Sequence, residues 1–173
     1  TAMYTNTTGS YNVALGVDAL RLNTTASNNT AVGYRAGYSL TTGASNTIVG
    51  NDAGYSVTGD LNTLVGKDAG YYITSGTKNT VIGKYNGNQG GLNITTSSNY
   101  IVLSDGAGTP QAYYNSSTTA WYLPSAYSNT TATAANAYIG SGGYIVRSTS
   151  ALKYKQDVRD LEEIDISKFR PVR

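Results

Sequence analysis

The chain has 173 residues and a net charge of +2, and charged side chains make up only 13% of it. So small a charge does not indicate nucleic acid or an acidic membrane as a partner, and no apolar run approaches the roughly 18 residues that span a bilayer. The sequence contains no cysteine and no histidine, which excludes disulfide frameworks, thiolate metal sites and Ser-His-Asp catalysis. We therefore expect no metal, no cofactor and no membrane insertion.

A five-residue motif recurs along the first half of the chain. Its copies, NVALG, NTAVG, NTIVG, NTLVG and NTVIG, begin at Asn12, Asn29, Asn46, Asn62 and Asn79, at steps of 17, 17, 16 and 17 residues. A second element follows each copy (DAL, RAG, DAG, DAG and a degenerate YNG), and this element and a third small-residue anchor keep the same steps. Three anchors in register over five units indicate a repeat architecture.

Each unit reads as a short strand, a glycine turn, a second short strand and a polar return. The units are too short and too poor in helix formers for a helical hairpin, and their Thr, Val, Ile and Tyr favour a pleated surface. Residues 1–98 are therefore predicted to form a β-solenoid with one coil per unit. The one-residue deletion between Gly50 and Gly66 fits the return. The repeated Asn and Thr are expected to stack into ladders that need no ligand.

The predicted strands place two apolar residues side by side, and adjacent strand residues point to opposite faces. One face fills the interior of the coil, and the other needs a second apolar surface, which identical copies around a symmetry axis supply. We expect Ile48, Leu64 and Val81, or their neighbours Val49, Val65 and Ile82, to line a three-fold axis. A monomeric solenoid with a slightly apolar side, or with a capping element, is the alternative.

The repeat NTAVGYRAGYSLTTGASNT resembles the repeats of trimeric bacteriophage tail fibres and, more distantly, the β-roll heads of trimeric autotransporter adhesins. The resemblance covers about residues 1–90. It implies a homotrimer in the virion tail, exposed outside the cell after assembly in the host cytoplasm. Its implied role is attachment to the host, with other tail proteins and a host cell-surface glycan or lipopolysaccharide as partners. The head of a bacterial adhesin is the alternative function.

Residues 99–148 lose the period but keep short strands and turns. A strand that begins near Asn99 is followed by an Asp-Gly turn at Asp105-Gly106, and residues 112–114 and 120–123 read as further strands. Residues 137–139 and 144–146 form a hairpin-like pair around glycines. This segment is predicted to be a β-rich distal region, and it also resembles phage fibre sequences.

The densest aromatic cluster lies in this segment, at Tyr113, Tyr114, Trp121, Tyr122 and Tyr127. One interpretation is a platform that stacks on sugars of a host glycan, because aromatic faces match apolar sugar faces while their polar tips stay wet. The other is that the rings form the trimer core where the coils end. We favour the second, and both stay open.

The composition changes at about residue 149. Residues 149–173 carry eleven of the 22 charged side chains, whereas residues 99–148 carry two. The stretch RSTSALKYKQDV, which begins at Arg147, is similar to the entry of the endosialidase-type intramolecular chaperone found at the C-terminus of many phage fibres. The FRPVR of residues 169–173 matches a later part of that domain. The resemblance implies the beginning of an α-containing chaperone domain in residues 149–173, and it selects a phage fibre over an autotransporter.

In that family a serine begins the chaperone, and a lysine five residues on assists scission of the bond before the serine. The resemblance thus implies Ser150 as the nucleophile, Lys155 as the base and cleavage between Thr149 and Ser150. Such a pair works without histidine where burial lowers the pKa of the lysine. The alternative is that Ser150 caps a helix over residues 152–158, with Lys153 and Lys155 in solvent.

Apart from this single-turnover step in the full-length precursor, we expect no enzyme activity. Asp52, Asp60, Asp68 and Asp105 are isolated among turns and lack the spacing of a metal-binding loop. The middle segment also lacks the paired carboxylates of a tailspike-type glycosidase.

Overall fold

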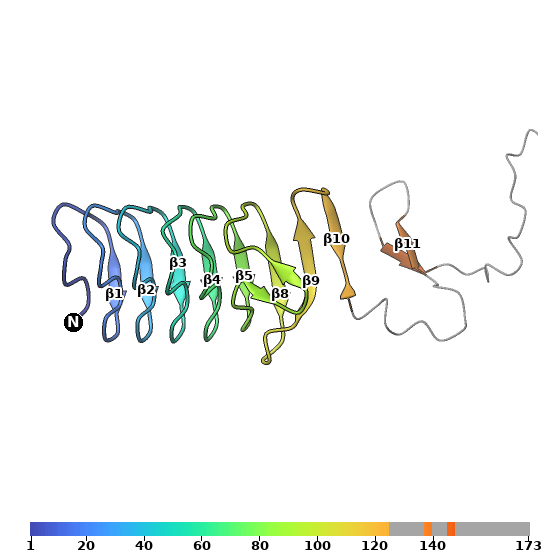
Figure 1. Ribbon diagram of the computed structural model, residues 1–173, viewed down its shortest axis with the longest axis horizontal. Helices are drawn as coiled ribbons and strands as arrows, with labels where there is room; N and C mark the ends of the chain where they lie inside the picture. The colour runs from blue at the N-terminus through green and yellow to red at the C-terminus, as the bar shows by residue number, and fades with distance from the viewer. Residues whose placement is uncertain (125–136, 140–144, 148–173) are drawn as a thin grey trace, which may run out of the picture. The chain divides into compact units, whose positions relative to one another are not determined.

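The computed structural model describes residues 1–124 and the backbone of two short strands, 137–139 and 145–147. Tyr127 and the expected Ser150 and Lys155 pair lie outside the described residues. The chain divides into two units, Thr1–Ser125 and Ala126–Arg173. The first is a stack of coils with one strand per coil, a β-solenoid with the predicted repeat of about 17 residues (Figure 1).

Six strands of this unit form a parallel sheet along one side of the stack. In order they are β1 (Val13–Leu15), β2 (Thr30–Val32), β3 (Thr47–Val49), β4 (Thr63–Val65), β5 (Thr80–Ile82) and β8 (Ile101–Ser104). The register is regular, so that Thr47 lies between Thr30 and Thr63, and Val49 between Val32 and Val65. Equivalent residues of successive repeats therefore form straight columns.

The coil between β5 and β8 is longer, because Thr80 pairs with Ile101. The extra residues form a small hairpin of β6 (Asn88–Gln89) and β7 (Leu92–Asn93), joined by Gly90 and Gly91. Both glycines have positive φ, 61° and 81°, as a two-residue hairpin turn requires. β8 lies after the expected boundary at residue 98 and still pairs in parallel with β5.

Two antiparallel strands complete the sheet, at the positions where the sequence predicted short strands. β9 (Pro110–Asn115) pairs with β8, and β10 (Ala120–Tyr122) pairs with β9. In the second unit, β11 (Ala137–Ile139) and β12 (Ile145–Arg147) form the predicted antiparallel pair.

The second strand expected in each unit is wrong. The DAG-type element forms turns instead, because its first residue has a left-handed backbone: φ is 58° at Asp18, 50° at Arg35, 54° at Asp52 and 57° at Asp68. A strand needs a negative φ at each residue. The turns nevertheless join coil to coil, for example through the Gly37 N–H that donates to the Ala53 carbonyl at 2.9 Å.

Small and aliphatic side chains fill the coil interior in columns. The second residue of β2, β3, β4, β5 and β8 is fully buried, as are an alanine of the turn and an aliphatic residue of the next corner. These columns are Ala31, Ile48, Leu64, Val81 and Val102; Ala36, Ala53 and Ala69; and Leu40, Val57, Ile73 and Ile94. Burial of one such aliphatic side chain stabilises the fold by roughly 1.5–3 kcal/mol, so the stack carries its own continuous core.

A ladder of asparagines runs beside this core, as the sequence predicted. The first residue of each motif accepts a hydrogen bond at its side-chain oxygen from the backbone N–H of the equivalent residue one coil further on. The distances are 2.9 Å for Asn12, 2.8 Å for Asn29, 2.9 Å for Asn46, 3.0 Å for Asn62 and, to Tyr100, 2.9 Å for Asn79. Asn29, Asn46, Asn62 and Asn79 are buried. The asparagines thus satisfy backbone groups that water cannot reach.

Candidate functional site

The outward side of the parallel sheet is a surface that repeats along the stack, and we call it the outer face. It consists of the first and third residue of each strand. These form a column of Val13, Thr30, Thr47, Thr63, Thr80 and Ile101 and a column of Leu15, Val32, Val49, Val65, Ile82 and Leu103. No charged residue occurs in either column. At its ends the face is open to solvent, with Leu15 67% and Leu103 44% exposed.

The structure separates the two sets of residues that the sequence offered for a three-fold axis. Ile48, Leu64 and Val81 are fully buried within their own coils, so this alternative is wrong. Val49 and Val65 are half-buried and Ile82 is exposed on the outer face. The outer residues are therefore the ones available to a second chain.

The four described aromatic residues of the predicted cluster form two pairs on opposite sides of the β9–β10 hairpin. Tyr114 pairs with Ile101 and Trp121 with Tyr114 in the sheet register, which places both rings on the outer face. Their ring centroids are 5.7 Å apart. Tyr113 pairs with the buried Val102 and therefore lies on the core side.

Tyr122 stacks on Tyr113, with ring centroids 4.8 Å apart and an interplanar angle of 5°. Burial raises the pKa of the Tyr113 hydroxyl, and the neighbouring Tyr122 adds to this. Because Tyr113 packs against the hydrophobic core, this second pair covers the end of the coil interior. The cluster is thus not one platform but an outer pair and a core-side pair.

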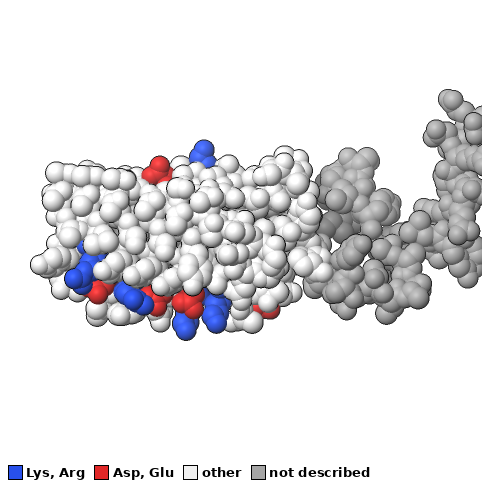
Figure 2. All heavy atoms as spheres, in the orientation of Figure 1, with Lys and Arg blue, Asp and Glu red and all other residues white. Residues whose placement is uncertain are grey.

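Ion pairs line another part of the stack, in the turns that follow the strands. In these turns Arg21 contacts Asp18 at 2.7 Å, and Arg35 contacts Asp52 at 2.7 Å. On the face seen in Figure 2, charged side chains gather in a line along one long edge, and most of the remaining surface is uncharged. Both pairs lie at the surface and are partly buried, and surface pairs contribute little to stability.

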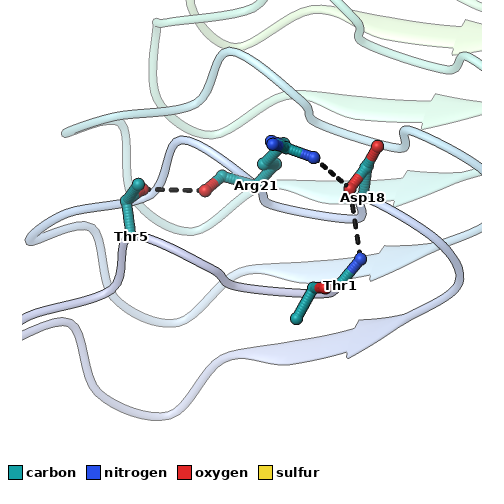
Figure 3. A network of polar contacts seen from close by, with 4 residues as sticks. All are labelled: Thr1, Thr5, Asp18 and Arg21. Carbon is teal, nitrogen blue, oxygen red and sulfur yellow. Dashed lines mark hydrogen bonds and ion pairs between the residues drawn. The ribbon is translucent and has the colours of Figure 1, made fainter.

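Asp18 illustrates the arrangement (Figure 3). Its carboxylate accepts hydrogen bonds from Arg21 at 2.7 Å and from the ammonium of Thr1 at 3.2 Å. The Arg21 guanidinium is the main reason that the pKa of this carboxyl group lies below its usual value. The Thr5 hydroxyl donates to the Arg21 carbonyl at 2.7 Å, which joins two coils.

Three tyrosines stack beside these ion pairs and form what we call the tyrosine ladder. The ring centroids of Tyr38 and Tyr55 and those of Tyr55 and Tyr71 are each 5.0 Å apart, with interplanar angles of 13° and 6°. Arg35 lies over the Tyr55 ring at 5.0 Å, a favourable cation–π geometry. This ladder was not among the predicted features, although the tyrosine that follows each AG of the second element is its signal in the sequence.

A cleft of about 240 Å³ lies where the ladder ends, lined by Asp68, Tyr71, Tyr72 and Asn86. Asn86 is the residue equivalent to Tyr71 in the next coil. The hydrogen bonds between coils show this: the Ser56 N–H donates to the Tyr71 carbonyl, and one coil later the Tyr72 N–H donates to the Asn86 carbonyl. The ladder therefore stops at Tyr71, and an amide replaces the next ring. The meeting of these four residues was not predicted from the sequence, because they come from two repeats and one of them belongs to the degenerate YNG element.

Within the described residues, no group of three or more His, Cys, Asp or Glu side chains lies close enough to hold a metal ion. The same part of the chain contains no helix that is long and apolar enough to cross a membrane. Comparisons with protein-family models, with curated proteins and with solved structures find no match.

Proposed function

We propose that this chain is the repeat-built part of a homotrimeric bacteriophage tail fibre that attaches the virion to the bacterial host. The observation that carries the proposal is the outer face. Its columns of Thr, Val, Leu and Ile run over six parallel strands without a charged residue. The column from Leu15 to Leu103 is a contiguous apolar stripe, and apolar stripes of this kind mark interaction sites on soluble proteins.

Identical copies are the partner that best suits this surface. Residues such as Ile48 and Leu64 already fill the coil interior. The outer face is therefore not part of the core of a single chain, and it can contact another chain. It repeats at every coil, and a copy related by an axis along the stack meets the same residues at every level. Tyr114 and Trp121 continue the outer face, so in this proposal they belong to the trimer contact rather than to a glycan site.

The sequence RSTSALKYK supports a phage fibre rather than an adhesin head. It is the reason that we place the protein in the virion tail, with other tail proteins and a host glycan or lipopolysaccharide as partners. Trimerisation is then assisted by a chaperone that Ser150 and Lys155 release by self-cleavage. The adhesin alternative predicts no scission between Thr149 and Ser150.

Native mass spectrometry and sedimentation of the product of a full-length precursor that contains this chain test the trimer. Val49→Lys places a charge in the outer face and should convert trimers to folded monomers. Asn51→Lys is the matched control, because it adds the same charge two residues away in an exposed turn position, where the next repeats carry Lys67 and Lys84. A wild-type chain that stays monomeric at high concentration, or a Val49→Lys chain that still forms trimers, would contradict the proposal.

A further inference from the structure

We propose that the cleft lined by Asp68, Tyr71, Tyr72 and Asn86 binds an uncharged sugar ring of a polysaccharide. Its volume of about 240 Å³ lies below the ~300–1,000 Å³ of pockets for drug-sized ligands, so the cleft suits one ring rather than an extended chain segment. The inference rests on the proposed attachment function only in one respect, namely that the sugar belongs to a glycan of the host. The chemistry of the site rests on the cleft alone.

The apolar part of the cleft comes from two rings that meet nearly at right angles. The centroids of Tyr71 and Tyr72 are 4.8 Å apart with an interplanar angle of 76°, and Tyr72 is 52% exposed. Such a corner offers one ring face to an incoming group while the other ring holds it in place. A sugar ring presents C–H groups that pack on an aromatic face, and its hydroxyls remain at the edge.

Asp68 supplies a hydrogen-bond acceptor that, unlike Asp18 and Asp52, contacts no arginine among the described residues. Asp18 is engaged by Arg21 and Asp52 by Arg35, each at 2.7 Å. Among the described residues, the Asp68 carboxylate accepts no hydrogen bond and has only the Lys67 ammonium at 3.9 Å, on a side chain that is 63% exposed. Its lone pairs are therefore free to accept from ligand hydroxyls.

Asn86 supplies the matching donor. Its side-chain oxygen accepts a hydrogen bond from the Asn88 N–H at 2.9 Å, which orients the amide. The amide nitrogen has no hydrogen-bond partner among the described residues. A carboxylate and an amide NH₂ beside two rings match a hydroxyl-bearing ring, because each sugar hydroxyl both donates and accepts.

The charge of the cleft selects among ligand classes. A carboxylate at the site disfavours acidic sugars, which would place a like charge beside Asp68. A quaternary ammonium could also contact aromatic rings and a carboxylate, but it has no acceptor for the Asn86 amide. The donor and acceptor pair therefore favours a neutral sugar.

An NMR titration of the intact chain with methyl glucoside, methyl galactoside, methyl mannoside and N-acetylglucosamine tests the site, with glucuronate and choline as charged comparisons. We expect at least one neutral sugar to shift the signals of Tyr71 and Tyr72. Tyr72→Ala should weaken that binding about tenfold. Asp68→Asn should weaken it less, because asparagine keeps one acceptor and tolerates the left-handed backbone at this position.

Tyr11→Ala is the control, since it removes an exposed tyrosine elsewhere in the stack and should leave binding unchanged. Binding of no neutral sugar, binding of choline alone, or a Tyr72→Ala chain that binds as the wild type would overturn the inference. A trimer that binds no sugar contradicts only the cleft. A monomer that binds a neutral sugar contradicts only the trimeric fibre.

Discussion

The side-chain oxygen of Asn46 accepts a hydrogen bond from the backbone N–H of Asn62 at 2.9 Å. Asn46 in turn donates its own backbone N–H to the Asn29 side-chain oxygen at 2.8 Å. Both side chains are buried, so no water replaces either bond. Asn46 thus holds three successive coils in register. It does so through backbone N–H groups that precede the three-residue strands and that the parallel sheet leaves unpaired.

Replacement of Asn46 by alanine should lower the free energy of unfolding by about 2–4 kcal/mol, because the buried N–H of Asn62 loses its acceptor. Urea denaturation measures the change. Asn51→Ala is the control, since Asn51 is exposed and its side chain hydrogen-bonds only to Asp52 among the described residues. An equal loss in both variants would argue against the ladder as the cause.

Gly50 closes the third motif with φ of 139°, and a Cβ atom placed on it would lie 2.3 Å from the carbonyl oxygen of Gly66. Gly50→Ala should therefore destabilise the stack by more than the ~1 kcal/mol typical of a point mutation, because two backbones would have to separate. Gly106→Ala should be nearly neutral, since a Cβ there meets no atom within 4 Å. Thermal unfolding of the two variants checks the difference, and similar melting temperatures would count against the close approach.

Asn23 is a natural weak point of the core. It is fully buried, and its side-chain oxygen has no hydrogen-bond partner within the part of the chain that the structure describes. The equivalent corner residues of the next coils are Leu40 and Val57. Asn23→Leu should raise the free energy of unfolding by about 1 kcal/mol, because it removes an unsatisfied buried group. The substitution would not leave the Ala26 carbonyl without a hydrogen-bond donor, because the Asn12 side chain donates to it at 2.7 Å.

The matched control is Asn79→Leu, which makes the same replacement in the ladder and should destabilise the protein, since Tyr100 N–H donates to the Asn79 side chain. Urea denaturation of both variants separates the two environments. If both substitutions stabilise, or both destabilise, the contrast between the two asparagines is wrong.

Self-cleavage remains a prediction from the sequence. A full-length precursor that contains this chain should be cut between Thr149 and Ser150, as mass spectrometry of the recombinant product would show. Ser150→Ala should leave an uncleaved trimer, and Lys155→Ala should slow scission strongly while trimers still form. The uncleaved trimer should unfold faster on heating in detergent, because a chaperone that stays attached lets the folded trimer return to unfolded chains. A wild-type precursor that folds and stays full length, or is cut elsewhere, would refute the assignment.

The period of the sequence predicted the solenoid because each repeat contributes the same strand, and the strands align at the same steps as the motifs. The asparagine ladder was predictable for the same reason. The second strand was not, since a left-handed residue such as Asp52 bends the chain, and sequence alone does not fix the sign of φ for a non-glycine residue.

The candidate cleft escaped the sequence analysis for a different reason. Asp68 appeared there as one isolated carboxylate. Only the contacts show that Arg21 binds Asp18 and Arg35 binds Asp52, whereas among the described residues Asp68 has only the Lys67 ammonium at 3.9 Å. The opposite directions of Tyr113 and Tyr114 follow from strand alternation. Which of them faces the core depended on the pairing with Val102, a contact between neighbouring strands rather than within a motif.

The stacked, parallel arrangement also determines how this part of the molecule responds to force. Backbone hydrogen bonds between strands join one coil to the next and therefore run along the stack (Figure 1). A pull along that direction loads the bonded layers in series, and since each coil contacts only its neighbours, layers would peel from an end one at a time. A load directed across the stack is instead shared by the covalent backbone of every coil. A lateral contact that grips many coils at once would therefore raise the tensile strength along the axis.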